Sequence, residues 1–297
     1  MRWGRLAVTC TLAACSIDVT GTRSGGAEAP RVGDAPPDGP TGDAGAGATP
    51  TGDGGAPIVA GDAAADAAAP SAGFAVSLTG NAFVSAGAVP IPADFTLEAW
   101  VRPKTAQGET YIAAKDQRNT GSGQFRLGLL QGGRLFFLMT DAGADDHGLF
   151  DSEYKLASPT PLALARWTHV AVTKSGASFQ LVVDGVAVAT RAADASFTHG
   201  APSRSFRVGA RIAPNGSAAD GSLDGEIDQV RLFDVARTAA EIAADMRRPI
   251  GPTDTIFGRL RAAWRFDEGA GTTSADDKST YAATLMGGAA WTTSGAY

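Results

Sequence analysis

The chain has 297 residues, a formal net charge of −6 and a pI near 5.1. This acidic balance argues against a nucleic-acid partner, because no basic excess is available to neutralise phosphates. The two cysteines, Cys10 and Cys15, both lie in the first fifteen residues. The rest of the chain can therefore form neither a disulfide framework nor a cysteine zinc site. No run of about eighteen apolar residues occurs, so no membrane-spanning helix is expected.

Residues 1–14 predict an export signal, because a basic start is followed by a short apolar stretch. The following LAAC, residues 12–15, resembles the lipobox of bacterial lipoproteins, in which the cysteine is acylated after cleavage. The resemblance implies lipidation at Cys15 and membrane attachment through the lipid anchor only. Ser16, where an Asp would signal inner-membrane retention, favours the outer membrane or surface of the bacterial cell envelope. An ordinary secretory signal with a chance cysteine is the alternative.

Residues 15–73 are expected to be a disordered tether. They consist mainly of Gly, Ala, Pro, Asp and Thr and contain no aromatic residue. Such a segment cannot bury enough apolar area to offset the entropy lost on ordering. A flexible chain of this length spans roughly 40 Å, which would hold the following domain, residues 74–297, away from a membrane.

Alternating apolar and polar residues predict β-strands throughout residues 74–297. The Asp184-Gly185 pair between two alternating runs is the strongest local hairpin signal. About a dozen short strands with Gly-rich turns predict an all-β fold, a two-sheet antiparallel β-sandwich. The expected strands are 74–78, 82–84, 95–103, 111–114, 124–130, 134–140, 167–173, 179–183, 186–190, 205–210, 227–233, 260–269, 283–286 and 290–292.

Residues 225–246 combine a predicted strand with a predicted short helix. Thr238 and Glu241 are spaced as in a capping box, and Ile242 and Met246 share one helical face, so we expect one short helix near 239–247. The preceding strand is expected to alternate without interruption. That places Ile227, Gln229, Arg231 and Phe233 on one face, and Asp228, Val230 and Leu232 on the other.

Four segments resemble the laminin-G-like jelly rolls of the concanavalin A-like lectin/glucanase group, in the order typical of that family. They are FTLEAWVRP at 95–103, WTHVAVT at 167–173, GEIDQVRLFDVARTAAEI at 225–242 and LRAAWRFDEG at 260–269. The resemblance implies a concanavalin A-like jelly roll from about residue 74 to residue 291.

The same resemblance implies a possible calcium cofactor, because these sandwiches often hold calcium through Asp, Asn and carbonyl oxygens. Asn81 and Asp228 are the candidates for one metal site. Asp267, with the Asp276-Asp277 pair, is the candidate for another. The alternative is that these residues serve turns, where Asp and Asn are common.

Loops on a rigid sandwich are the expected place for recognition of a glycan or an extracellular protein. Plain solvated connections are the alternative. The candidate residues of a ligand-binding rim are Asn119, Asp145, Asp146, His147 and Asn215.

Glu226 and Asp228 form an E-x-D pair like that of retaining glycosidases built on a concanavalin A-like sandwich. Retaining hydrolysis needs a second carboxyl about 5–5.5 Å away, but the acid/base positions hold Val230 and Arg231. We therefore expect no enzyme, but a non-catalytic envelope lipoprotein that recognises carbohydrate or another extracellular polymer. The alternatives are a structural or protein-adhesion module of the envelope without a sugar site and, less favoured, a retaining glycosidase.

Overall fold

The computed structural model describes residues 73–116, 125–139, 155–192 and 204–296. All of them belong to the compact unit formed by residues 64–297. The predicted signal, the predicted lipidation site Cys15 and the predicted tether up to residue 72 lie outside the described residues. Within the described ranges, no helix has the length and apolar character required to cross a membrane.

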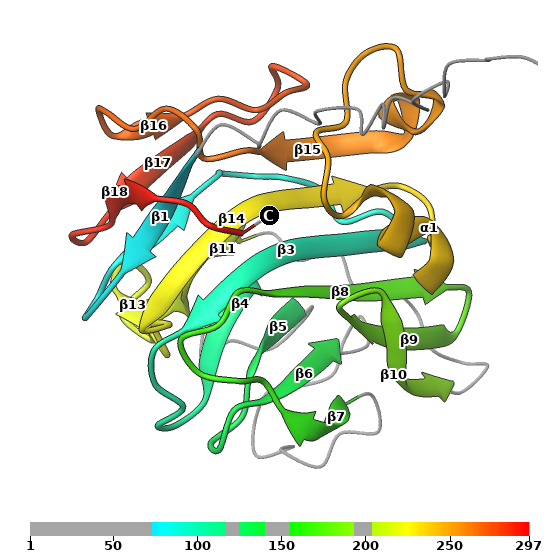
Figure 1. The fold of residues 1–297 in the computed structure, drawn as a ribbon. Helices are drawn as coiled ribbons and strands as arrows, with labels where there is room; N and C mark the ends of the chain where they lie inside the picture. The colour runs from blue at the N-terminus through cyan, green and yellow to red at the C-terminus, as the bar shows by residue number, and fades with distance from the viewer. Residues whose placement is uncertain (1–72, 117–124, 140–154, 193–203, 297) are drawn as a thin grey trace, which may run out of the picture. The chain divides into compact units, whose positions relative to one another are not determined.

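The first layer is an eight-stranded antiparallel sheet (Figure 1). Its strands are β1 (Phe74–Leu78), β3 (Phe95–Pro103), β8 (Thr168–Ser175), β9 (Ser178–Val183), β10 (Val186–Ala192), β14 (Gly225–Phe233), β15 (Leu260–Trp264) and β18 (Ala290–Thr293). Their order is β10-β9-β8-β3-β14-β1-β18, and β15 pairs with β14 beside this path. The predicted hairpin at Asp184-Gly185 is confirmed, because these two residues connect the paired strands β9 and β10.

The second layer is also an eight-stranded antiparallel sheet, in the order β16-β17-β2-β11-β4-β5-β6-β7. Its strands are β2 (Phe83–Ser85), β4 (Thr110–Ala114), β5 (Phe125–Leu129), β6 (Arg134–Met139), β7 (Lys155–Pro161), β11 (Arg207–Val208), β16 (Thr273–Ser274) and β17 (Ala283–Met286). The remaining elements are the β12 (Arg211–Ile212) and β13 (Ala219–Asp220) hairpin, helix α1 (Ala239–Asp245) and a 3-10 turn η1 (Thr255–Arg259). The predicted all-β sandwich with one short helix is confirmed.

The core lies between the two sheets and is built from the apolar residues that alternate along their strands. The ring of Phe95 in β3 lies 5.5 Å from that of Phe125 in β5 and 6.1 Å from that of Phe137 in β6. Phe206 and Trp264 stack at 5.7 Å and join the two layers near β15. These aromatic contacts therefore pack the inward-facing residues of one sheet against those of the other.

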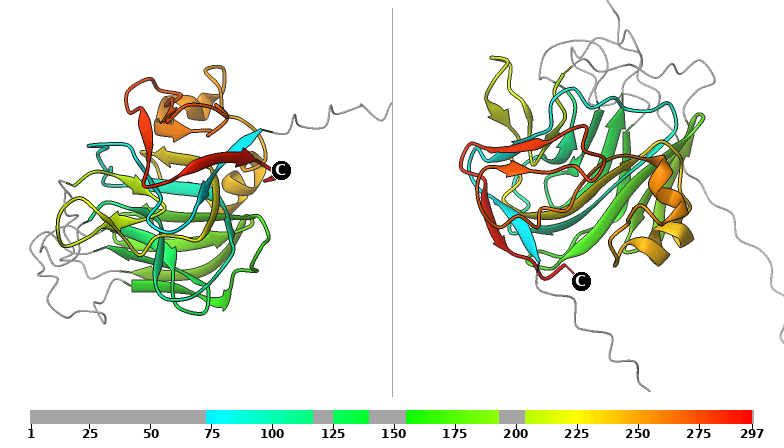
Figure 2. Two further views of the ribbon diagram at one scale, coloured as in Figure 1. Left: turned by 90° about the vertical axis from the view of Figure 1, so that its left-hand side faces the viewer. Right: turned by 90° about the horizontal axis from the view of Figure 1, so that it is seen from above.

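The C-terminal strands complete both sheets next to the first strands of the domain. β18 pairs with β1 and β17 pairs with β2. Both views in Figure 2 show the end of β18 beside the start of β1, where Ser294 N donates to Gly73 O at 2.8 Å. The last strands are therefore integral parts of the fold.

β14 does not alternate as predicted, because a β-bulge interrupts it at Gln229. Asp228 pairs with Trp100 and Arg231 pairs with Glu98, so two residues of β14 face the single residue between them on β3. Gln229 adopts a positive φ of 51°. The prediction that Ile227 and Val230 point to opposite faces is therefore wrong. Both lie in the main core, and Arg231 points to the outer face.

Helix α1 and the chain after it cover the outer face of β3, β8 and β14. The predicted capping box is confirmed: Thr238 N donates to Glu241 Oε2 at 2.7 Å, and Glu241 N donates to Thr238 Oγ1 at 3.2 Å. Ile242 packs on Ala171 and Val182, as its predicted helical face requires.

Beneath the helix, the fully buried carboxylate of Glu98 binds two arginines. Arg231 Nη1 lies 3.2 Å from Oε1, and Arg237 Nη1 lies 3.3 Å from Oε2. Arg237 also binds Asp245 at the end of α1. Burial raises the pKa of Glu98, and the two guanidinium charges oppose this rise. The helix is thus held to the sheet by a buried ionic network as well as by apolar contacts.

Candidate functional site

An open cleft with a volume of about 330 Å³ lies where three segments distant in sequence meet. The segments are the loop between β2 and β3, the start of β15, and the loop between β16 and β17. We call this site the β15 cleft. Its lining residues are Pro90, Pro92, Leu260, Arg261, Lys278, Thr280 and Tyr281. This volume lies at the lower end of the range of about 300–1,000 Å³ that is typical of ligand pockets.

The loop that carries Lys278, Thr280 and Tyr281 is fixed by the buried carboxylate of Asp276. Oδ1 accepts hydrogen bonds from Ala263 N at 2.8 Å and Lys278 N at 3.1 Å. Oδ2 accepts from Thr280 N at 3.1 Å and Tyr281 N at 3.0 Å. Three of these donors shape the loop and Ala263 N ties it to β15, so one wall of the cleft is ordered before any ligand arrives.

Tyr281 and the two prolines supply flat apolar surfaces to this cleft. Tyr281 is partly buried against the main core, and its backbone oxygen accepts a hydrogen bond from Trp264 Nε1 at 2.7 Å. Within the described residues, its phenol makes no hydrogen bond. Pro90 is exposed and Pro92 is half-buried on the opposite loop. The cleft thus combines an amphipathic aromatic ring with apolar ring faces that are open to a ligand.

The charges in the lining are both positive. Arg261 binds Asp234, which also binds Arg259 with Nε 2.8 Å from Oδ1. Lys278 Nζ lies 4.1 Å from the centre of the Phe257 ring and donates to Phe257 O at 3.3 Å. Among the described residues, no acidic side chain lines the cleft, although the chain as a whole is acidic.

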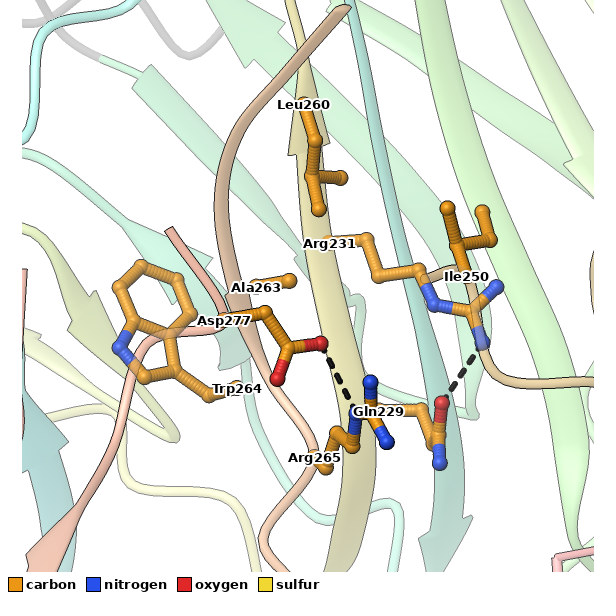
Figure 3. A pocket seen from close by; sticks show the side chains of 8 residues that line it. All are labelled: Gln229, Arg231, Ile250, Leu260, Ala263, Trp264, Arg265 and Asp277. Carbon is orange, nitrogen blue, oxygen red and sulfur yellow. Dashed lines mark hydrogen bonds and ion pairs between the residues drawn. The ribbon is translucent and has the colours of Figure 1, made fainter. Parts of the chain in front are cut away.

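A second, narrow crevice adjoins this cleft through Leu260, which lines both. It runs between β14, β15 and the chain at Ile250 (Figure 3). Its polar groups bind each other: Arg231 Nη2 donates to Gln229 Oε1 at 2.6 Å, and Arg265 Nε donates to Asp277 Oδ2 at 2.8 Å. The first bond lies within β14, and the second ties the chain after β15 to the loop between β16 and β17, so we assign the crevice to the packing of the sandwich.

The residues predicted to bind calcium are distributed differently from the expected pairs. Asn81 is exposed in the turn between β1 and β2. Asp276 is occupied by four backbone donors, and Asp277 pairs with Arg265. Among the described residues, no group of three or more His, Cys, Asp or Glu side chains is placed to hold a metal ion.

The structure instead brings together the charges of Asp228 and Asp267. Asp228 is buried in β14, where Ser294 Oγ donates to its Oδ2 at 2.5 Å. Asp267 is exposed and accepts a hydrogen bond from Phe74 N at 3.3 Å. Burial raises the pKa of Asp228 to about 7, the Ser294 hydrogen bond opposes this rise, and the charge of Asp267 adds to it.

Of the predicted rim residues, only Asn215 lies in the described part of the chain. It occupies the exposed tip of the β12–β13 hairpin, where its Oδ1 accepts from Ser217 N at 3.2 Å and Ala218 N at 3.1 Å. These contacts are those of an Asx turn. Asn119, Asp145, Asp146 and His147 lie outside the described residues.

The E-x-D pair does not form a free pair of carboxylates. Both oxygens of Glu226 bind cations, with Arg102 Nη1 at 2.9 Å from Oε2 and Lys104 Nζ at 3.2 Å from Oε1. The positions that would carry the acid/base are Val230, which is buried in the core, and Arg231, which binds Glu98.

The two-sheet sandwich with its small cleft defines a protein of the concanavalin A-like class. The chain belongs to the family described as the concanavalin A-like lectin/glucanases superfamily, whose model matches residues 78–243. The resemblance predicted from the four segments is therefore confirmed. The strands from β15 to β18 complete the sheets beyond the matched residues. A comparison with curated proteins found no match.

Solved structures with a similar fold include a Bacteroides ovatus protein provisionally assigned as carbohydrate binding. The two share 18% identity with a TM-score of 0.56, over 75% of this chain and 60% of that one. This chain thus spans 60% of the length of the Bacteroides protein. The heptameric SAP-like pentraxin of Limulus polyphemus is 14% identical, with a TM-score of 0.51 over 75% of this chain and 96% of the pentraxin. At these identities the likeness shows the fold.

The residues of the β15 cleft were not singled out by the sequence. The sequence predicts metal ligands at Asp276 and Asp277, not the wall of a cleft. The signal that bears on the cleft is the aromatic Tyr281 shortly after this pair, together with the two prolines at 90 and 92. Their proximity depends on the pairing of β17 with β2 and of β15 with β14.

Proposed function

We propose that this chain is a non-catalytic carbohydrate-recognition module and that the β15 cleft is its binding site. The observation that carries the proposal is the combination, in one rigid cleft, of the Tyr281 ring with nearby hydroxyl, ammonium and guanidinium groups. Small-molecule sites commonly combine apolar and aromatic walls with a few fixed polar groups. Saccharides match such a lining because they present both apolar C–H faces and many hydroxyls.

Non-catalytic action is supported by the ionic contacts of the carboxylates. A retaining glycosidase needs one free nucleophile and one protonated acid about 5–5.5 Å apart. Glu226 is bound by two cations, and in the part of the chain that the structure describes no carboxyl group lines the β15 cleft. Membership of a lectin and glucanase superfamily agrees with the carbohydrate part of the proposal, as does the provisional assignment of the Bacteroides protein.

We also propose display on the bacterial envelope through a lipid on Cys15 and the tether of residues 15–73. The support is the LAAC tetrapeptide at 12–15 and the aromatic-free composition of the tether. Incorporation of labelled palmitate into the full-length chain, and its loss in Cys15→Ser, would test the lipidation. An unlabelled wild-type chain in a host that labels another lipoprotein would contradict it.

Calcium binding stays a sequence-based prediction. Asp228 and Asp267 are the two predicted ligands whose charges the structure brings together. Calorimetric titration of the chelated chain with calcium should give heat and a higher melting temperature. The absence of both would end the prediction.

A glycan array probed with the full-length chain tests the proposed function, with chromatography of the incubated glycans as the test for hydrolysis. We expect binding to a restricted set of glycans and no shortened products. Product formation would overturn the non-catalytic part. Silence on plant, bacterial and host glycans would contradict carbohydrate binding, and a specific partner recovered from envelope extracts would then favour a protein-adhesion module.

A further inference from the structure

We propose that the β15 cleft selects an acidic saccharide, in which Arg261 and Lys278 recognise the carboxylate of a uronic acid residue. The inference rests on the proposed carbohydrate-binding function. It adds the charge class of the ligand and the residues that recognise it.

The β15 cleft carries positive charge although the chain as a whole is acidic. The chain has a net charge of −6, yet the two charged side chains that line the cleft are both positive. Asp234 is shared by Arg259 and Arg261, so that cluster of two cations and one anion keeps one positive charge. Lys278, on the loop between β16 and β17, adds a second positive charge. Positive charge in the cleft of an acidic protein favours anionic ligands over neutral ones and repels cationic ones.

The acidic residues next to the cleft do not cancel this charge at its surface. Asp276 is buried below the loop and directed at four backbone N–H groups. Asp277 forms an ion pair with Arg265, with Nε 2.8 Å from Oδ2, and lines the neighbouring crevice instead.

Arg261 and Lys278 both keep N–H donors available for a ligand. A guanidinium has five N–H donors, and within the described residues Arg261 uses one nitrogen, Nη2, to bind Asp234. Its side chain is 54% exposed. Lys278 has three ammonium donors, one of which is used by Phe257 O at 3.3 Å, and the Phe257 ring supports its position. Charge-assisted hydrogen bonds from such donors to a carboxylate are about twice as strong as neutral ones.

The remaining lining of the β15 cleft suits a sugar ring in shape and in rigidity. Tyr281 and the prolines offer flat surfaces to a sugar ring, and the Thr280 hydroxyl, which donates to Lys278 O at 3.1 Å, can accept from a sugar hydroxyl. The volume of about 330 Å³ suits about one or two saccharide rings. Because the Asp276 carboxylate fixes the backbone of Lys278, Thr280 and Tyr281 before binding, little backbone ordering of this loop opposes the contact.

Titration calorimetry of the full-length chain against polygalacturonate and its fully methyl-esterified form tests the inference, because the two polymers differ only in the carboxylate. We expect the acid form to bind at least tenfold more tightly. Arg261→Gln and Lys278→Gln should each weaken its binding by about tenfold, since each removes a charge-assisted hydrogen bond. Arg166→Gln is the matched control, because Arg166 also pairs with a single aspartate, Asp184, and neither residue lines the cleft. Equal melting temperatures will show that each variant is folded.

Each other outcome is informative. Equal binding of the ester and the acid, or binding of neutral dextran alone, would overturn the charge selection and leave carbohydrate binding intact. Dextran sulfate binding as tightly as polygalacturonate would overturn selection for a carboxylate. Unchanged affinity in both cleft variants would overturn the assignment of the residues. If none of the polysaccharides bound, this inference would fail, and silence on the glycan array would be needed to reject the proposed function as well.

Discussion

The buried carboxyl of Asp228 should make the stability of the domain depend on pH in a direction unusual for an aspartate. Burial raises its pKa from 3.8 to about 7, so between these values the folded chain holds a proton that the unfolded chain releases. The free energy of unfolding therefore rises as pH falls from about 8 to about 4, for this residue alone. The displacement corresponds to about 4 kcal/mol, at about 1.36 kcal/mol per pH unit.

Asp228→Asn removes the titration while keeping an oxygen that can accept from Ser294 Oγ. Urea unfolding of both chains at intervals from pH 4 to pH 8, with chelator present to exclude bound cations, gives the difference in unfolding free energy. We expect this difference to change by about 4 kcal/mol across the range, with the variant relatively more stable at pH 8. Titrating groups that do not interact with Asp228 cancel. A difference that stays constant, or moves the other way, would refute the argument from burial.

Two further substitutions test the fold. Glu98→Gln should lower the unfolding free energy by about 3–5 kcal/mol in urea, because it removes the buried carboxylate that Arg231 and Arg237 share and leaves Arg237 with Asp245; a loss below about 1 kcal/mol would show that the network is dispensable. Gly128→Ala should cost about 1–3 kcal/mol or more, because its Cβ would lie 2.1 Å from Thr110 O. Gly258→Ala meets no atom within 4 Å and is the matched control, so equal melting temperatures for the two variants would contradict the predicted clash.

Most of the fold follows from patterns that are local in the sequence. Period-two alternation, the Asp184-Gly185 turn and the Thr238–Glu241 capping box each depend on a few neighbouring residues, and the structure confirms them. The bulge at Gln229 is not local. It is set by the register of β14 against β3, and a non-glycine residue with a φ of 51° carries no recognisable sequence signal.

The β15 cleft was beyond prediction for the same reason. Pro90 and Tyr281 stand far apart in the chain, and the strand pairing that brings them together cannot be read from either segment. Asp276 illustrates the limit of composition: an Asp pair in a Gly-rich loop suggested a metal, whereas the carboxylate binds four backbone N–H groups. Its role depends on Ala263, which lies on a different strand.

Carbohydrate binding at the β15 cleft is tested most directly by calorimetric titration of the full-length chain and its Tyr281→Ala variant with the strongest ligand from the glycan array. Loss of a central aromatic contact commonly costs about 2 kcal/mol or more, so we expect Tyr281→Ala to bind at least tenfold more weakly. Tyr281→Phe, which keeps the ring, should retain most of the affinity. An unchanged Kd in a Tyr281→Ala chain with the wild-type melting temperature would contradict binding at this cleft.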